Sequence, residues 1–256
     1  MHYEHALMKK PAYSLAQGIT TQSLDQPPVY EKAMQQHRGY ETALKACGVT
    51  PVVLWETPEY PDSCFVEDTA VLTDTGAIIS SPGHSHRRGE EKQLERLLKI
   101  EMHIWGKIRG PGTLDGGDVV RTEEQYCIGL SQRTNEEGAL QLRNILEKLG
   151  YRTALIPVPQ NVLHLTTGSG YLGERTMLCI PEFAEGFRRA GFKPMVVDED
   201  ERYAANVLLV NGTVLMPKGF PKTRQKIESL HERIKELEMS EFEKLDGGIT
   251  CLSLRW

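Results

Sequence analysis

The sequence predicts an α/β fold in which the sheets are mixed rather than purely parallel. Short apolar runs typical of strands alternate with segments of helical periodicity along the 256 residues. Several of the apolar runs pair across turn sequences, so hairpins come between the helices, whereas a simple βαβ series would place one helix after each strand. Because no Pro- or Ser-rich linker divides the chain, we interpret residues 1–256 as one domain built from several ββαβ-like units.

The predicted strands are short apolar runs, and turn sequences join some of them into hairpins. Asp74-Thr75-Gly76 and Asn211-Gly212 each lie between two such runs, and Asn-Gly is the stronger turn signal of the two. The predicted strands cover residues 52–55, 69–72, 76–79, 117–120, 125–129, 163–165, 176–180, 193–197, 207–210 and 213–216.

Helical periodicity predicts helices at residues 30–47, 90–98, 135–149 and 223–237. The third has the clearest apolar face, which consists of Ala139, Leu142, Ile145, Leu146 and Leu149. Thr134 is its expected N-cap, and Glu137 three residues later would complete a capping box. Gly150 then supplies the C-terminal stop.

Composition limits the class of function. The chain is 39% hydrophobic and 25% charged, which is typical of a globular protein, and no apolar run approaches the roughly 20 residues that cross a bilayer. The formal net charge of −5 gives no attraction to nucleic acid or to an anionic membrane. The first ten residues lack the order of a signal peptide, so we expect a cytoplasmic protein.

The five cysteines are odd in number, widely spaced and without a CxxC pair, which argues against a disulfide framework and a zinc site. Cys127 and Cys179 lie inside apolar runs, and we expect them on core strands. Cys251 differs, because it follows Gly247-Gly248-Ile249-Thr250. A thiol just after such a flexible turn is a candidate nucleophile.

Carboxylates gather beside turns. Leu-Asp-Gly-Gly occurs at 114–117 and again at 245–248, which hints at a repeated structural unit. Turn formation or helix capping is the simple explanation of any single Asp. Glu67-Asp68 is harder to explain in this way, because apolar residues flank the pair and at least one carboxylate must face a buried region. Such a carboxylate needs a cationic partner, either an internal Arg or a ligand such as a guanidinium.

A base and two anion-binding candidates accompany the thiol. His164 lies in a predicted strand, where a satisfied core histidine is the common case, but Cys251 requires a base and Cys–His pairs with an orienting carboxylate activate thiols. Arg87 precedes a predicted helix and suits a carboxylate ligand, although a solvated capping loop is an alternative, and Arg133 has the same ambiguity. His84 and His86, at i and i+2, are weak evidence for a metal.

Taken together, these residues resemble the dimethylarginine dimethylaminohydrolases, within the wider guanidino-group-modifying family of arginine deiminases and amidinotransferases. Any one motif is weak, but the matching segments are collinear and span nearly the whole chain. They are residues 61–68, 85–90, 112–118, 131–135, 163–165, 203–206 and 246–253.

The resemblance implies a five-bladed α/β propeller of ββαβ units around a central channel that holds the substrate. It implies hydrolysis of asymmetric dimethylarginine or monomethylarginine to citrulline plus dimethylamine or methylamine, through a covalent Cys-thiouronium intermediate. The expected ligand is a small guanidino amino acid, and no metal or organic cofactor is expected. The family contains both monomers and homodimers.

The resemblance also implies residue roles. Cys251 matches the nucleophile, His164 the general acid/base, and Asp115 the carboxylate that orients the histidine. Some members have Glu at this last position, so the shorter Asp puts its distance to His164 in question.

Further positions match substrate-binding residues of the family. Glu67 and Asp68 resemble guanidinium-side carboxylates, and Asp62 resembles an acid near the amino-acid end. Arg87 and Arg133 match the residues that hold the α-carboxylate. Ile19 matches a lid-loop residue whose carbonyl meets the α-amino group, and Asp246 in the second Leu-Asp-Gly-Gly is also assigned to the substrate site.

Two alternatives remain at this point. The first keeps the chemistry but changes the substrate to arginine or another alkylguanidine, and the product released distinguishes it. The second is a non-enzymatic binding protein on the same fold, as in ribosome anti-association factors. That reading predicts loss of the thiol, the histidine or the acids, and all of them are present.

Overall fold

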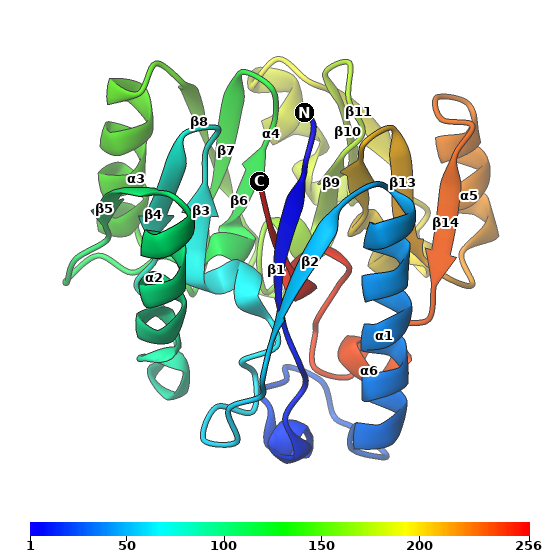
Figure 1. Cartoon of the computed structure of the whole chain (residues 1–256). Helices are drawn as coiled ribbons and strands as arrows, with labels where there is room; N and C mark the ends of the chain where they lie inside the picture. The colour runs from blue at the N-terminus through cyan, green and yellow to red at the C-terminus, as the bar shows by residue number, and fades with distance from the viewer.

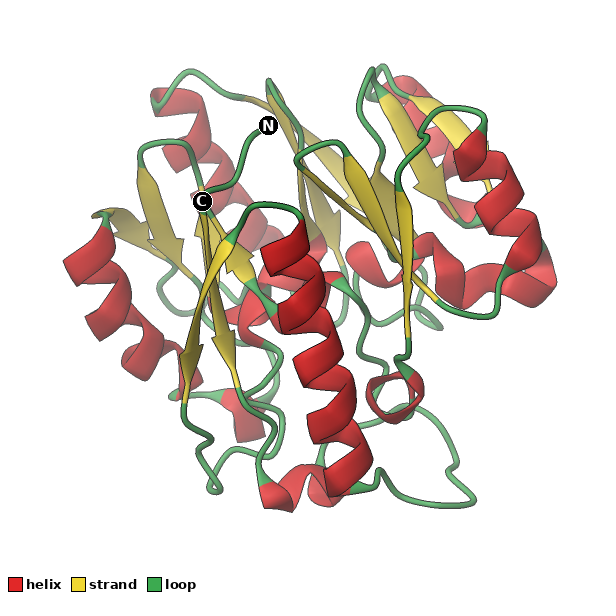
Figure 2. Ribbon diagram, turned by 45° about the vertical axis from the view of Figure 1, so that its right-hand side comes forward, coloured by secondary structure: helices red, strands yellow, loops and turns green.

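The computed structural model describes residues 1–256, whose strands form five sheets of three strands each. The sheets surround a central axis and the helices lie outside them (Figures 1 and 2). In each sheet the middle strand pairs antiparallel with one neighbour and parallel with the other. This is the five-bladed arrangement of ββαβ units that the resemblance implies, so the predicted fold class is confirmed.

The first four blades share one order of elements: a short 3-10 turn (η), an antiparallel strand pair, a helix and a third strand. Blades one and two contain η2 (Val66–Thr69), β3 (Ala70–Leu72), β4 (Gly76–Ile79), α2 (Glu90–Glu101), β5 (His103–Lys107), η4 (Gly116–Asp118), β6 (Val119–Arg121), β7 (Gln125–Leu130), α3 (Glu136–Lys148) and β8 (Arg152–Pro157). Blades three and four contain η5 (Thr166–Gly168), β9 (Ser169–Tyr171), β10 (Thr176–Cys179), α4 (Ala184–Arg189), β11 (Lys193–Val196), η7 (Glu199–Ala205), β12 (Leu208–Val210), β13 (Thr213–Pro217), α5 (Pro221–Glu228) and β14 (Ile234–Leu237).

The fifth blade is closed by both ends of the chain. Its elements are η8 (Thr250–Leu252), β15 (Leu254–Arg255), β1 (His5–Lys9), α1 (Tyr30–Ala46) and β2 (Thr50–Leu54). β15 pairs antiparallel with β1, with Leu254 opposite Leu7, and β1 pairs parallel with β2. The two termini therefore lie close together beside the central axis (Figure 1). Outside the blades are η1 (Tyr13–Gln17), η3 (Ser85–Arg87), η6 (Pro181–Phe183) and α6 (Ser240–Glu243).

Apolar side chains fill the space between each sheet and its helix. In the second blade, Leu142 and Leu146 of α3 join Tyr126 and Ile128 of β7 in one buried cluster. Cys127 and Cys179 are fully buried on β7 and β10, as predicted. No helix is long and apolar enough to cross a membrane.

The β12–β13 turn confirms the Asn-Gly prediction. Asn211 and Gly212 have positive φ values of +48° and +80°, as this type of two-residue hairpin turn requires at both positions.

The predicted capping box of α3 is wrong. Asn135 caps the helix, because its Oδ1 accepts the Gly138 N–H at 2.8 Å, whereas Thr134 Oγ1 accepts the Asp115 N–H at 3.1 Å.

Two predicted elements are also wrong. The helix predicted at 223–237 ends at Glu228, and β14 takes residues 234–237, where Ile234 pairs with Val214 of β13. Sheet pairing outweighs a weak local helical preference there. Residues 163–165 form no strand, because the strand of that blade begins only at Ser169, after η5. His164 therefore lies on a loop that leads into a 3-10 turn.

Candidate active site

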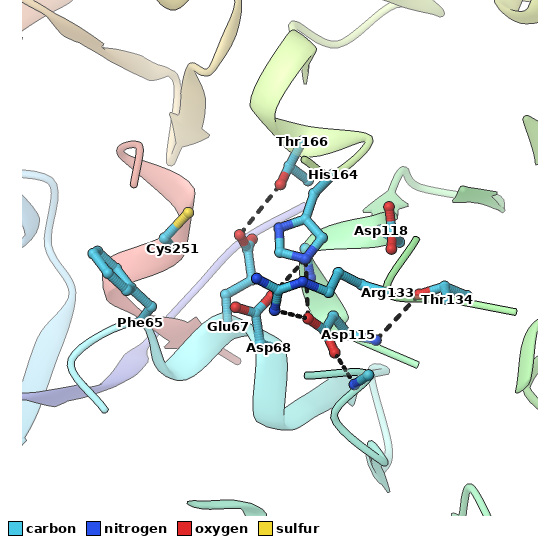
Figure 3. A network of polar contacts seen from close by, with 12 residues as sticks. Phe65, Glu67, Asp68, Asp115, Asp118, Arg133, Thr134, His164, Thr166 and Cys251 are labelled. Carbon is cyan, nitrogen blue, oxygen red and sulfur yellow. Dashed lines mark hydrogen bonds and ion pairs between the residues drawn. The ribbon is translucent and has the colours of Figure 1, made fainter. Parts of the chain in front are cut away.

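The candidate catalytic side chains lie in, or one or two residues before, the 3-10 turns at the start of the blades. Asp68 lies in η2, Asp115 immediately precedes η4, His164 lies two residues before η5, and Cys251 is the central residue of η8. The side chains point into one region between the blades (Figure 3). Residues from four different blades, widely separated in the sequence, are thus brought together by the ring-like fold.

Asp115 contacts His164 directly. Asp115 Oδ2 lies 3.0 Å from His164 Nε2, and Asp115 is fully buried. Its other oxygen accepts the Gly83 N–H at 2.8 Å, and Arg133 Nη1 donates to Oδ2 at 3.2 Å. Asp115 therefore reaches the imidazole, although its side chain is one methylene shorter than the glutamate of some family members. These contacts fix both the position of Asp115 and the orientation of the ring.

His164 is held in its charged form. Burial disfavours the charged ring, but Asp68, whose Oδ1 lies 3.9 Å from Nε2, and the hydrogen bond to Asp115 outweigh burial and raise the pKa of His164 to about 9. The imidazole is consequently an imidazolium at neutral pH. In that state it can donate a proton to a leaving group.

Cys251 is held in its neutral form by the protein alone. Burial, together with the negative charges of Glu67 and Asp68, raises the pKa of the Cys251 thiol well above its usual value. The Gly248 N–H, 3.3 Å from Sγ, opposes this only partly. A cation bound beside the sulfur would shift the balance toward the thiolate.

Arg87 is almost fully engaged by protein groups. It forms a buried ion pair with Asp68, and its Nη2 donates to Glu90 Oε2 at 2.6 Å and to the Phe65 carbonyl at 3.0 Å. Arg133 has a single ion-pair partner, Asp115. The guanidinium of Arg133 is therefore the freer of the two to bind an added carboxylate.

One cavity connects most of the predicted residues. Eight of the ten predicted site residues line it: Ile19, Asp62, Asp68, Arg87, Arg133, His164, Asp246 and Cys251. Phe65, Leu163, Leu245 and Gly247 complete the wall. Asp115 lies behind His164, and Glu67 lies outside the cavity wall. The cavity thus combines a thiol, an imidazolium, carboxylates and arginines, as a zwitterionic guanidino ligand requires.

The position of Glu67 differs from the expectation that it faces the substrate guanidinium. Its Oε2 accepts the Thr250 hydroxyl at 2.7 Å, and its Oε1 lies 3.5 Å from Arg255 Nη2. Successive residues of a 3-10 turn point about 120° apart, so Glu67 and Asp68 cannot both face the same cavity. Glu67 instead holds the turn that carries Cys251.

Two carboxylates hold the segment that follows η1 against the cavity. Both oxygens of Asp62 accept the Ile19 N–H, at 3.0 and 3.2 Å. Asp246 accepts the Thr21 N–H at 2.6 Å and the Gln22 side-chain amide at 2.9 Å. Ile19 lines the cavity, and Asp246 is bound to the two residues that follow Thr20 in the same segment.

The two Leu-Asp-Gly-Gly copies occupy different places in their blades. In the first copy η4 begins directly after Asp115, whereas in the second η8 begins only at Thr250, four residues after Asp246. The fold does repeat a structural unit, as the echo hinted, but the two copies do not occupy equivalent positions in that unit. The repeated feature is the 3-10 turn followed by a strand, and its sequences share no motif.

Sequence reasoning missed residues that position the catalytic groups. Asp118 Oδ1 accepts the Leu165 N–H at 3.0 Å and so fixes the backbone next to His164. Gly117 is required by a close approach, because a Cβ there would lie 2.7 Å from Asp68 Oδ1 and 2.8 Å from His164 Nδ1. A glycine pair between two aspartates was a signal for such crowding.

The site contains a group of potential metal ligands that does not suit a metal ion. One ligand atom each of Asp68, Asp115 and His164 lie within 4.8 Å of one another. However, Arg87 pairs with the first carboxylate and Arg133 with the second. The histidine also holds a proton, whereas a metal ligand must give it up.

Comparison with known proteins points to one family. The family model for eukaryotic N,N dimethylarginine dimethylhydrolase matches residues 17–193. An N(G),N(G)-dimethylarginine dimethylaminohydrolase of Pseudomonas aeruginosa is 40% identical over 99% of this chain and 100% of its own length. One of Streptomyces coelicolor is 33% identical over 100% of this chain and 98% of its own length.

Solved structures agree. A cysteine-to-serine mutant of the Pseudomonas aeruginosa enzyme, complexed with citrulline, superposes with a TM-score of 0.96 at 39% identity and covers both chains completely. A second structure is a histidine-to-glycine variant of a dimethylarginine dimethylaminohydrolase, in an adduct with S-methyl-L-thiocitrulline. It superposes with a TM-score of 0.94 at 39% identity and covers 99% of this chain and 100% of its own. The N-terminal domain of a cyanobacterial arginine dihydrolase shares the fold, with a TM-score of 0.87 at 19% identity. The match covers 98% of this chain and 96% of that domain.

Proposed function

The chain belongs to the dimethylarginine dimethylaminohydrolase family, and we propose that it hydrolyses Nω-methylated arginine to citrulline plus dimethylamine or methylamine. The observation that carries the proposal is the shared cavity wall of Cys251, His164 and Asp68, with Asp115 hydrogen-bonded to the histidine. These are a nucleophile, an acid/base with its orienting carboxylate, and an anion for the substrate guanidinium. The relatives that carry this name match the whole chain.

In this proposal the cavity holds both ends of a guanidino amino acid. Asp68, kept in place by Arg87, faces the substrate guanidinium. Arg133 binds the α-carboxylate, since it is the less engaged of the two arginines. The Ile19 segment, fixed by Asp62, covers the α-amino end. Holding the substrate at both ends places its guanidinium carbon against the Cys251 sulfur, so that the attack becomes nearly unimolecular.

The substrate itself activates the thiol. Its positive charge offsets the negative charges that raise the Cys251 pKa and so favours the thiolate. The thiolate attacks the guanidinium carbon and forms a tetrahedral adduct. His164, protonated below its pKa of about 9, gives its proton to the departing amine and leaves a covalent thiouronium. Neutral His164 then takes a proton from water, which attacks the thiouronium carbon, and citrulline leaves as the thiolate is restored.

The direct test is incubation of the purified protein with asymmetric dimethylarginine, monomethylarginine and arginine, each followed by assays for citrulline and for the released amine. We expect citrulline in equal amount to dimethylamine or methylamine from the first two. Citrulline plus ammonia from arginine, with the methylated substrates unchanged, would instead assign the arginine-hydrolysing activity. Citrulline from none of the three would contradict both and leave the binding-protein alternative.

Replacement of Arg133 by alanine is expected to raise KM for dimethylarginine about ten- to hundredfold. A charge-assisted hydrogen bond contributes roughly 1.5–3 kcal/mol, which corresponds to this range. Steady-state kinetics should show that kcat/KM for a dimethylguanidine without an amino-acid end changes much less. Arg152→Ala, an exposed arginine paired with Glu124, is the control and should leave both unchanged. If KM for dimethylarginine stays constant, Arg133 serves only its contact with Asp115.

A further inference from the structure

The fourth blade contributes none of the ten predicted site residues, but its 3-10 turn, η7, ends at a buried asparagine. Asn206 directly follows η7 and is 2% exposed. We propose that Asn206 is a positioning residue that holds the turn carrying Cys251 in register with the turn that follows His164. This proposal rests on the proposed function, because it concerns the geometry of the same reaction.

The side-chain amide of Asn206 joins two blades at once. Its Nδ2 donates to the Thr166 carbonyl at 2.7 Å and to Thr250 Oγ1 at 3.0 Å. Its Oδ1 accepts the Thr250 N–H at 3.0 Å. Thr166 lies two residues after His164, and Thr250 immediately precedes Cys251. A single planar group therefore fixes the backbone beside the acid/base relative to the backbone beside the nucleophile.

Glu67 extends this link to the first blade. The Thr250 hydroxyl, which accepts from Asn206, donates in turn to Glu67 Oε2 at 2.7 Å. Glu67 precedes Asp68, so the chain of hydrogen bonds ties three reacting segments together. Because a buried hydroxyl and a buried carboxylate are both satisfied by this link, its loss would leave unpaired polar groups in the interior.

The Asn206 amide packs closely against the turn that carries Cys251. A Cβ on Gly248 would lie 2.4 Å from Asn206 Cγ, so the glycine permits the amide to approach the turn. Gly248 also donates its N–H to Cys251 Sγ. An aspartate has the shape of Asn206 but no N–H donors, and it would add a negative charge beside Glu67 and the thiol. The N–H donors of the side chain and its lack of charge therefore both favour asparagine over aspartate at position 206.

The test compares Asn206→Ala with Asn211→Gly. Asn211 is a matched control in the same blade, because its side chain also makes three hydrogen bonds, to Tyr3 N–H, Tyr3 carbonyl and Cys47 carbonyl. Glycine tolerates the positive φ at position 211, so the control removes contacts without adding strain. Both variants should unfold at lower temperature. Only Asn206→Ala should lower kcat for dimethylarginine, by about a hundredfold with KM within threefold, since small misplacements of reacting groups cost this much.

A second readout does not depend on turnover. The rate of alkylation of Cys251 by iodoacetamide is measured by mass spectrometry at a series of pH values. This rate reports the apparent pKa of the thiol in the folded protein. Asn206→Asp should raise the apparent pKa of alkylation above that of the wild type, whereas Asn211→Gly should leave it unchanged. A kcat for Asn206→Ala within threefold of the wild type, or equal losses in Asn206→Ala and Asn211→Gly, would overturn the proposal. Failure of the wild type to hydrolyse methylarginines would instead overturn the proposed function and leave the alkylation comparison intact.

Discussion

Cys251→Ser is expected to lower turnover of dimethylarginine by a factor on the order of 10⁴ or more while substrate binding persists. A serine hydroxyl ionises far less readily than a thiol, and the site offers it no stronger base than a histidine that is already protonated. The cavity wall, including Arg133 and Asp68, is otherwise unchanged. Dissociation constants for dimethylarginine or citrulline, measured by calorimetry, should therefore stay within severalfold of the wild-type values.

Cys47→Ser is the appropriate control, because Cys47 is a half-buried free thiol outside the cavity. It should retain full activity. Mass spectrometry of a quenched reaction should find the substrate-derived thiouronium on the peptide that contains Cys251 in the wild type and not in the variant. Wild-type turnover by Cys251→Ser would remove the thiol from the mechanism.

The sequence was sufficient to select the proposed reacting groups but not all of their neighbours. Cys251 could be singled out because it follows a Gly-Gly turn rather than an apolar run. Asp115 and His164 could be paired through the family resemblance, and the two lie 3.0 Å apart. The α/β class followed from hairpins between helices, but residue patterns alone gave no closed ring of five blades. Closure depends on β15 pairing with β1, and a two-residue strand has no readable periodicity.

The errors have a common physical origin in contacts between residues that are distant in the sequence. Glu67 and Asp68 look equivalent as neighbours in sequence, yet the 3-10 turn directs one toward Thr250 and the other toward the cavity. Asn206 lies in a segment that matches the family, but no role could be assigned to it, because its three hydrogen bonds reach residues at least 40 positions away. Local propensity likewise misassigned residues 234–237, whose strand forms only against β13. Local sequence patterns indicate which residue types are present, but the contacts among distant residues form only in the folded propeller.

His164→Ala is expected to separate the two halves of the reaction. With dimethylarginine, turnover should fall by roughly 10²–10⁴-fold or more, because the departing amine has lost its proton donor and water has lost its base. With S-methyl-L-thiocitrulline, the leaving methanethiolate needs no such proton. We therefore expect one equivalent of methanethiol and a covalent adduct on Cys251 that persists, because its hydrolysis still requires the base. Intact-protein mass spectrometry would detect the adduct, and ordinary turnover of both substrates would remove His164 from its role.

The same variant should lose a pH dependence of stability that His164 gives the wild type. Its pKa is raised from the ordinary 6.5 to about 9 in the folded protein, so the folded state binds the extra proton between these values. The resulting stabilisation is fully present below pH 6.5 and is lost as the pH rises through about 9. A shift of this size corresponds to about 3 kcal/mol. Urea unfolding of the wild type should therefore show a free energy of unfolding that falls from pH 6 to pH 9.5, whereas that of His164→Ala should fall much less. Parallel curves for the two proteins would mean that His164 is neutral in the folded site, and the proton for the departing amine would then have to come from another group.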